Sequence, residues 1–281
     1  MTITLLVTIP VLVILWIVYT SRDLMMIVGR WILHRRYAVT LSGVEALKPD
    51  QINLVIPNHP AIVDPLILVP ELYGQQINVR PLIDESYFSD RIARHLFALV
   101  NGVRVPDFRH VNFRSGVPLL GRLTMIRRKR MDAYRRAKAL CYTVLATLTE
   151  GGSILVYPSG HITTDGRERI QGRSLVYNVI SQMPKDVRII GVRMRGIYGS
   201  IWSRVGGRPP APWLPTFLKA ALILWPLAWF RKKRQVSIYF EDITDECREW
   251  ATKTKAEFIS ALENWYDADL RLIGRDSEEP T

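Results

Sequence analysis

A histidine and a carboxylate lie five residues apart in this sequence, at a spacing suited to proton transfer. His59 follows the strand-like run 52–58, and Pro60 prevents a helix from continuing back through it. Asp64 falls in the first turn of the helix-like run 64–74. This spacing lets the carboxylate reach Nδ1 of the imidazole, fix its tautomer and stabilise the imidazolium formed when Nε2 accepts a proton. The alternative is that Asp64 caps the helix and His59 is an ordinary turn residue.

The position of His59 favours the chemical interpretation, because functional groups of open α/β sheets gather at the carboxyl ends of strands. A second strand-to-turn segment, 153–163, contains a glycine-bearing turn whose N–H groups can bind an anion or a polar acceptor. Ser159 in this turn lacks the Gly-x-Ser-x-Gly context of a serine nucleophile. The sequence has no Gly-x-Gly-x-x-Gly or Walker-type run either, so a nucleotide cofactor is not predicted.

Strand-like and helix-like runs alternate along the chain, which predicts an α/β fold with a mixed, largely parallel central sheet flanked by helices. The expected strands are 52–58, 77–83, 153–158, 187–194 and 235–240, and the expected helices are 64–74, 89–100, 131–151 and 246–270. We expect one domain over residues 23–270, followed by a polar, disordered tail at 271–281.

Two apolar segments predict attachment to a membrane. Residues 2–20 carry no charge and are about long enough to cross a hydrocarbon core of roughly 30 Å, so residues 1–22 are expected to form a transmembrane anchor. Four arginines follow within residues 22–36, which places the domain on the cytoplasmic face, with 24–36 continuing along the interface. The second segment, 211–234, ends in a basic cluster and is expected to be a helical hairpin or an interfacial segment lying in the leaflet; its alternative is a buried core helix. The protein is therefore expected to be a single-pass or monotopic membrane protein.

The charge of the chain favours anionic partners. Its formal net charge is +12, from 38 Lys+Arg and 26 Asp+Glu. The basic stretch 104–138 is suited to anionic lipid or to the phosphates of an acyl donor, and the alternative is a solvated helix face. The predicted anchor argues against nucleic acid as a partner. Cys141 and Cys247 are too few for a disulfide framework or a zinc site, and no metal is expected.

Four segments resemble the conserved blocks of the glycerolipid acyltransferases, the family that includes 1-acylglycerol-3-phosphate acyltransferase. NHPAIVD (58–64) resembles the Asn-His-x4-Asp block, and LVYPSGHIT (155–163) resembles the Phe-Pro-Glu-Gly block. IIGVRMRG (189–196) is similar to the hydrophobic-Pro-Val block, and NGVRVPD (101–107) best matches the block whose arginine binds the acceptor's phosphate. Within this family, the amino-acid sequence of these blocks most resembles the acyltransferase domains related to 2-acylglycerophosphoethanolamine acyltransferase.

The resemblance implies acyl transfer without an acyl-enzyme. His59, oriented by Asp64, would deprotonate a hydroxyl of a lysophospholipid or glycerol-phosphate-type acceptor, which attacks the thioester of acyl-CoA or acyl carrier protein. No cofactor is implied beyond this co-substrate, and membrane lipids are the expected partners. The implied substrate-binding residues are Asn58, Arg104, Pro158, Ser159, Gly160, His161 and Arg193.

The sequence departs from the family pattern in the two later blocks. Ser159 stands where the family has an acidic residue, His161 follows the glycine, and Gly191 stands where the last block has proline. These departures affect the acceptor site and leave the predicted base intact. The alternative function is a catalytically inactive membrane protein that binds lipid or a partner on the same scaffold.

Overall fold

The computed structural model describes residues 20–106, 119–170, 175–209, 211–212, 215–216, 218 and 232–276. The predicted anchor, most of the apolar segment 211–234 and much of the basic stretch lie outside these residues. None of the helices described within these ranges has the length and apolar character needed to span a bilayer.

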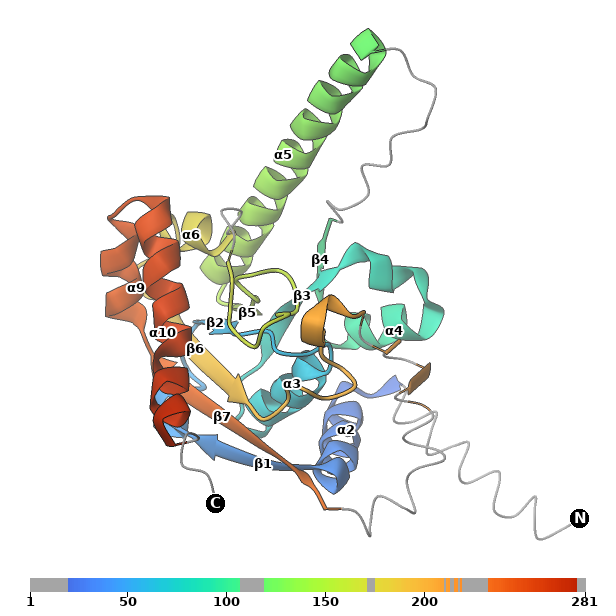
Figure 1. Cartoon of the computed structure of the whole chain (residues 1–281), viewed down its shortest axis with the longest axis vertical. Coiled ribbons are helices and arrows are strands. Elements are labelled where there is room, and N and C mark those ends of the chain that lie inside the picture. The colour runs from blue at the N-terminus through green and yellow to red at the C-terminus, as the bar shows by residue number, and fades with distance from the viewer. Residues whose placement is uncertain are drawn as a thin grey trace, which may run out of the picture.

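The described chain forms a seven-stranded mixed sheet (Figure 1). The strands run in the spatial order β1-β7-β6-β2-β5-β3-β4, and all neighbours are parallel except β6 and β7. Their bounds are β1 Tyr37–Ser42, β2 Asn53–Pro57, β3 Val79–Asp84, β4 Val103–Val105, β5 Ser153–Leu155, β6 Arg188–Arg195 and β7 Arg234–Asp242. The prediction of a mixed, largely parallel sheet is confirmed.

Helices cover both faces of the sheet, as Figure 1 shows. On one face, α2 (Arg22–Arg36) packs along α3 (Asp64–Gly74), and both contribute to one apolar core. The opposite face is covered by α5 (Leu119–Thr149), α6 (Leu175–Ile180), α9 (Thr244–Ala251) and α10 (Lys255–Asp276). A further helix, α4 (Arg91–Leu99), precedes β4.

The central strand β2 is buried on both faces. Val55 belongs to the core under α3, whereas Leu54 and Ile56 belong to the core under α5 and α10. This alternation explains why the segment is a nearly continuous apolar run, as expected for a parallel strand with helices on both sides. It also fixes the register, and therefore the place where the chain leaves the sheet at Pro57.

The structure corrects several element boundaries. β1 and β4 were absent from the sequence prediction, α5 begins at Leu119 instead of 131, and the predicted helix 246–270 is two helices separated after Ala251. α10 continues to Asp276, past the predicted start of the tail. β4 has only three residues and β1 is partly exposed, so neither shows a long apolar run.

The chain changes direction between β2 and β5, which are neighbours. After β2 it continues through α3 to β3, on one side of the pair; after β5 it continues through α6 to β6, on the other side. The carboxyl ends of β2 and β5 therefore form a topological switch point, the usual location of ligand sites in such sheets.

Candidate active site

The switch point brings together the two turns that the sequence singled out. The turn containing His59 follows β2, and the turn at 157–160 follows β5. The ring of Tyr157 stacks on the imidazole of His59, with centroids 4.1 Å apart and planes inclined by 27°. The backbone N–H of Thr163 donates to the carbonyl of His59 over 3.0 Å. Each turn is thus held in place by the other.

His59 and Asp64 make the predicted contact. Nδ1 of His59 lies 3.1 Å from Oδ2 of Asp64, and the same Oδ2 accepts a 2.8 Å hydrogen bond from the N–H of Ala61. The His59 side chain is 15% exposed and that of Asp64 is fully buried. This arrangement leaves Nε2 as the ring nitrogen that is not directed at the carboxylate, which is the orientation needed for a general base.

The Asp64 carboxylate carries a cost of burial that the histidine offsets. Burial raises the pKa of Asp64, while the hydrogen bond and charge of His59 and the N–H of Ala61 oppose that rise. Asp64 is the first residue of α3 and is followed directly by Pro65. Its side chain turns back to Ala61 and His59 and does not act as the helix cap, because Val63 occupies the cap position.

A second buried carboxylate lies at the same turn and was not predicted from the sequence. Oε2 of Glu168 accepts a 2.9 Å hydrogen bond from the backbone N–H of His59, and Glu168 is only 2% exposed. Burial raises the pKa of Glu168, and the neighbouring Ser159 and the backbone N–H of His59 oppose that rise. The segment around Glu168 has no regular periodicity, so only the fold reveals its position.

The turn after β5 has the open glycine expected of a ligand-facing loop. Gly160 has a φ of 64°, and nothing lies within 4 Å of the place where a Cβ would be. The Ser159 hydroxyl donates to the carbonyl of His161 over 2.9 Å, and Nδ1 of His161 lies 2.7 Å from the carbonyl of Ser159. Pro158 is buried at the start of this turn. All four predicted residues of the turn therefore lie on the loop beside His59.

Asn58 and Arg193 have partners within the protein. The Asn58 side chain donates to the carbonyl of Met194 (3.1 Å) and accepts from its N–H (2.7 Å), which ties the end of β2 to β6. Arg193 forms a 2.6 Å ion pair with Glu241 and lies over the rings of Tyr239 and Trp265. The Asn58 contacts therefore join β2 to β6, and the Arg193 contacts join β6 to β7 and to α10.

Gly191 makes room for the same helix. A Cβ at this position would lie 2.4 Å from the ring of Trp265 on α10 and 2.7 Å from Ile243. Gly191 replaces the family's proline, and the indole of Trp265 fills the space that a larger side chain would occupy.

Arg104 is placed away from this turn. It lies on β4, which is three strands from β2, a separation of about 14 Å at the usual strand spacing. Its guanidinium lies 4.6 Å from the centre of the Phe88 ring, and the residue is exposed.

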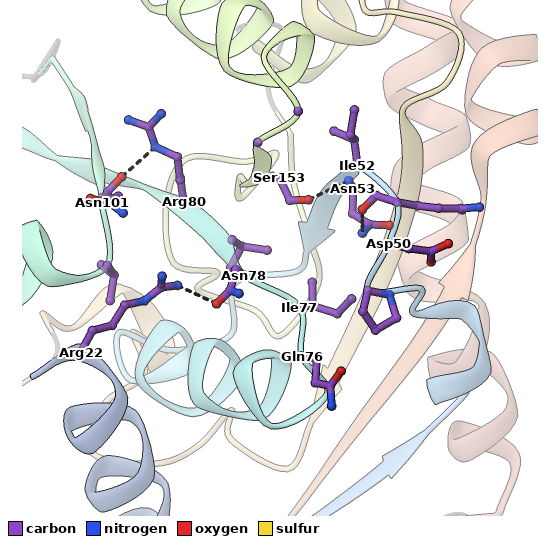
Figure 2. A pocket seen from close by; sticks show the side chains of 16 residues that line it. Arg22, Asp50, Ile52, Asn53, Gln76, Ile77, Asn78, Arg80, Asn101 and Ser153 are labelled. Carbon is purple, nitrogen blue, oxygen red and sulfur yellow. Dashed lines mark hydrogen bonds between the residues drawn. The ribbon is translucent and has the colours of Figure 1, made fainter.

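Two cavities lie at opposite ends of the sheet. One, of about 330 Å³, is at the amino ends of β2, β3 and β5 (Figure 2). Its polar groups bond to one another: Arg22 to Asn78 (2.9 Å), Arg80 to the carbonyl of Asn101 (3.1 Å) and Ser153 to the N–H of Asn53 (2.9 Å). Since β2 runs from Asn53 to Pro57, this cavity lies a full strand length from His59.

The other cavity, of about 350 Å³, adjoins the turn that contains His59. It is lined by Asn58 and Pro60 from that turn, by Asp165, Gly166 and Arg167 from the loop after β5, and by residues at the end of β6. Arg167 is exposed, whereas Arg195 donates to the carbonyl of Tyr266 over 2.5 Å. In the part of the chain with described positions, no cluster of His, Cys, Asp and Glu is arranged to hold a metal ion.

Comparison with known proteins agrees with the family resemblance and with the fold. A family model described as "Acyltransferase" matches residues 38–195, which include both turns. The chain belongs to the acyltransferase family, and its match supports the glycerolipid branch inferred from the sequence blocks. A search of curated proteins finds no match.

A solved structure has a similar fold. It is the 1-acyl-sn-glycerophosphate (LPA) acyltransferase PlsC from Thermotoga maritima, with a TM-score of 0.52 and 13% sequence identity. The alignment covers 92% of this chain and 83% of that chain. At this identity the comparison establishes a common fold.

Proposed function

We propose that this protein transfers a fatty acyl group from a thioester donor, acyl-CoA or acyl carrier protein, to a hydroxyl of a lysophospholipid or glycerol-phosphate-type acceptor. The observation that carries the proposal is the contact between Nδ1 of His59 and the buried Oδ2 of Asp64 at the switch point of the sheet. Membership of the acyltransferase family supports the reaction class.

His59 acts as general base in this mechanism. Nε2 takes the proton of the acceptor hydroxyl as its oxygen attacks the thioester carbonyl carbon. The carbon–sulfur bond then breaks, and the departing thiolate receives the proton from the imidazolium. Asp64 keeps Nδ1 protonated and stabilises the imidazolium throughout. A thioester is already activated, so one base and accurate positioning are sufficient.

The acceptor is proposed to enter through the cavity beside Asn58 and Pro60. Arg167, exposed on its rim, offers a guanidinium to a phosphate group, the kind of anion that arginine binds in a bidentate manner. The N–H of Gly160 donates to the carbonyl of Tyr157 over 3.0 Å, so it is the backbone beside this open glycine that we propose to face the acceptor. Arg104 stays an alternative phosphate contact that the experiment below can separate from Arg167.

We further propose that the reaction takes place on the cytoplasmic surface of a membrane. Three apolar residues of α2 follow helical spacing and are exposed: Leu24 by 36%, Ile27 by 57% and Trp31 by 49%. The guanidinium of Arg35 lies over the Trp31 ring. A helix with exposed apolar residues bordered by arginines is suited to the lipid interface. The same helix packs along α3, whose first residue is Asp64.

The test is a transfer assay with purified full-length protein. The donor is either acyl-CoA or acylated acyl carrier protein, each with a radiolabelled acyl group. Each donor is offered with a panel of lysophospholipids and glycerol phosphates, and labelled product is counted. We expect product with at least one acceptor and a loss of about a thousandfold in His59→Ala. Activity unchanged by that substitution would contradict the mechanism.

The panel also tests the alternative of a catalytically inactive lipid- or partner-binding protein. This alternative is raised by Ser159, which stands where the family has an acidic residue. Binding of acceptor lipid with no product from either donor would favour that alternative.

A further inference from the structure

Glu168 has an environment that stability alone does not explain. Its carboxylate is buried and accepts the backbone N–H of His59. Within the part of the chain that the structure describes, the charged groups that act on it are His59 and His161, and its Oε1 has no hydrogen-bond partner. A buried carboxylate without a fixed cation is costly. A neutral glutamine would accept the same hydrogen bond at a lower cost, so the hydrogen bond by itself does not account for the charge.

The carboxylate is bonded to the backbone of the residue on which charge develops in the proposed reaction. Asp64 approaches the imidazole of His59 from α3, and Glu168 approaches the His59 backbone from the loop after β5. Ser159 is one of the groups that oppose the raised pKa of Glu168, so this carboxylate lies near the position that is acidic in the family block. The chain therefore carries, nine residues further along, an acid that reaches the same turn.

We propose that Glu168 is a positioning residue for acyl transfer, which holds the His59 backbone and presents a second anion to the imidazolium. This proposal rests on the proposed function and deepens it. Asp64 fixes the ring through Nδ1, while Glu168 fixes the main chain from which that ring projects.

The other titratable groups around Glu168 do not replace its charge. Tyr157 from the turn after β5 has a buried hydroxyl, and Tyr266 from α10 is buried throughout. Burial raises both pKa values well above the ordinary range, with further contributions from the charges of Asp64 and Glu168 at Tyr157 and of Glu168 at Tyr266. Both phenols therefore stay neutral near neutral pH. His161 lies on the same loop and acts on the Glu168 carboxylate, so its NMR signal is followed separately from that of His59.

Glu263 on α10 provides a matched control, because its carboxylate bonds to the loop that carries Glu168. Its Oε1 accepts the backbone N–H of Ile170 over 2.6 Å, two residues from Glu168, and its side chain is 22% exposed. Glu263→Gln therefore changes a carboxylate that holds the loop backbone without facing His59.

The experiment follows histidine titration by NMR in the full-length protein labelled with ¹⁵N-histidine, alongside kcat and KM. The chain has five histidines, and His59→Ala and His161→Ala assign the two relevant signals. In Glu168→Gln we expect the His59 midpoint to move to lower pH by about half a unit or more, because an anion near the imidazolium is lost. We expect kcat to fall by about tenfold, with KM changed less than threefold.

Glu168→Ala, which also loses the acceptor for the His59 N–H, should lower kcat by about a hundredfold, whereas Glu263→Gln should leave the His59 midpoint and kcat unchanged. If Glu168→Ala does not fold, Glu168→Gln still decides the question. A His59 midpoint unchanged in Glu168→Gln, or shifted equally in Glu263→Gln, would overturn the proposal. If the wild-type protein transfers no acyl group, the proposed function fails, and the titration still reports on the contact between Glu168 and His59.

Discussion

The imidazole of His59 lies against the ring of Tyr157 with their centroids 4.1 Å apart, so a residue that follows β5 supports the residue that follows β2. The two side chains are far apart in sequence and meet only because their strands are neighbours in the sheet. The stack closes one face of the imidazole, while Asp64 holds Nδ1.

This contact predicts different results for two substitutions of Tyr157. The Tyr157 hydroxyl is buried without a hydrogen-bond partner among the described residues, so Tyr157→Phe keeps the stack and removes an unsatisfied group. We expect unchanged kcat and a free energy of unfolding that is equal or about 1 kcal/mol higher. Tyr157→Leu loses the stack and should lower kcat about tenfold. Steady-state kinetics and thermal unfolding measure both; a large loss in the phenylalanine variant would assign a role to the hydroxyl instead.

Replacing Asp64 separates activity from stability. In Asp64→Asn the amide donates to Nδ1 and favours the wrong tautomer, so kcat/KM should fall by about 10²–10⁴-fold. Because the folded-state pKa of Asp64 is raised, its ionisation opposes folding as the pH rises through that value, and the variant should be at least as stable as wild type at pH 7. Asp90→Asn, at the cap of α4, is the control, since asparagine caps equally well. An active Asp64→Asn enzyme would refute the orienting role.

Two arginines are candidates for binding the phosphate of the proposed acceptor. Arg167 borders the cavity beside Pro60, whereas Arg104 lies three strands from β2. We expect Arg167→Ala to raise the KM for a phosphate-bearing acceptor by about tenfold, and Arg104→Ala to change it little. The measurement is KM for the acceptor at saturating donor. The opposite ranking would restore Arg104 as the phosphate contact.

The exposed apolar residues of α2 predict binding to anionic vesicles. Ile27→Ser combined with Trp31→Ser should reduce co-sedimentation with phosphatidylglycerol-containing vesicles, because both side chains are about half exposed. Ile92→Ser on α4, which also removes an exposed apolar side chain, should not. Assays use a protein lacking residues 1–19 and the corresponding full-length protein, so that the contribution of α2 is seen with and without the predicted anchor. If Ile92→Ser reduced vesicle binding as much as the double substitution in α2, the effect would come from apolar surface in general and not from α2.

A pH-dependent contribution to stability is predicted for Asp242. Burial alone would raise its pKa, but hydrogen bonds from Thr244 and Arg188 outweigh this and hold the pKa below its ordinary value. The contribution is therefore present above about pH 4 and is lost as the pH falls through the folded-state pKa. Asp242→Asn should lower Tm at pH 7 by roughly 2–4 °C, a small effect because the side chain is partly exposed.

The difference from wild type should narrow when the same unfolding series is repeated from pH 4 downwards. Asp186→Asn, at an exposed position, is the control and should leave Tm unchanged at every pH. A difference that persists at the lowest pH would show that Asp242 acts through packing rather than through its charge.

The sequence by itself determined the features that depend on local spacing. The strand β2, the turn at His59 and the helix beginning at Asp64 are contiguous, so the five-residue separation was sufficient to predict their contact. The alternation of strands and helices likewise predicted a largely parallel sheet, because each parallel connection requires a helix-length crossover.

Only the tertiary structure decided which distant residues share the site. Strand order brings Tyr157 and Glu168 to His59, and it places Arg104 three strands away although its segment matches a family block. The predicted substrate residue Arg193 meets Glu241 because β6 and β7 pair antiparallel. These relationships depend on the pairing of strands far apart in the chain, and local periodicity carries no information about that order.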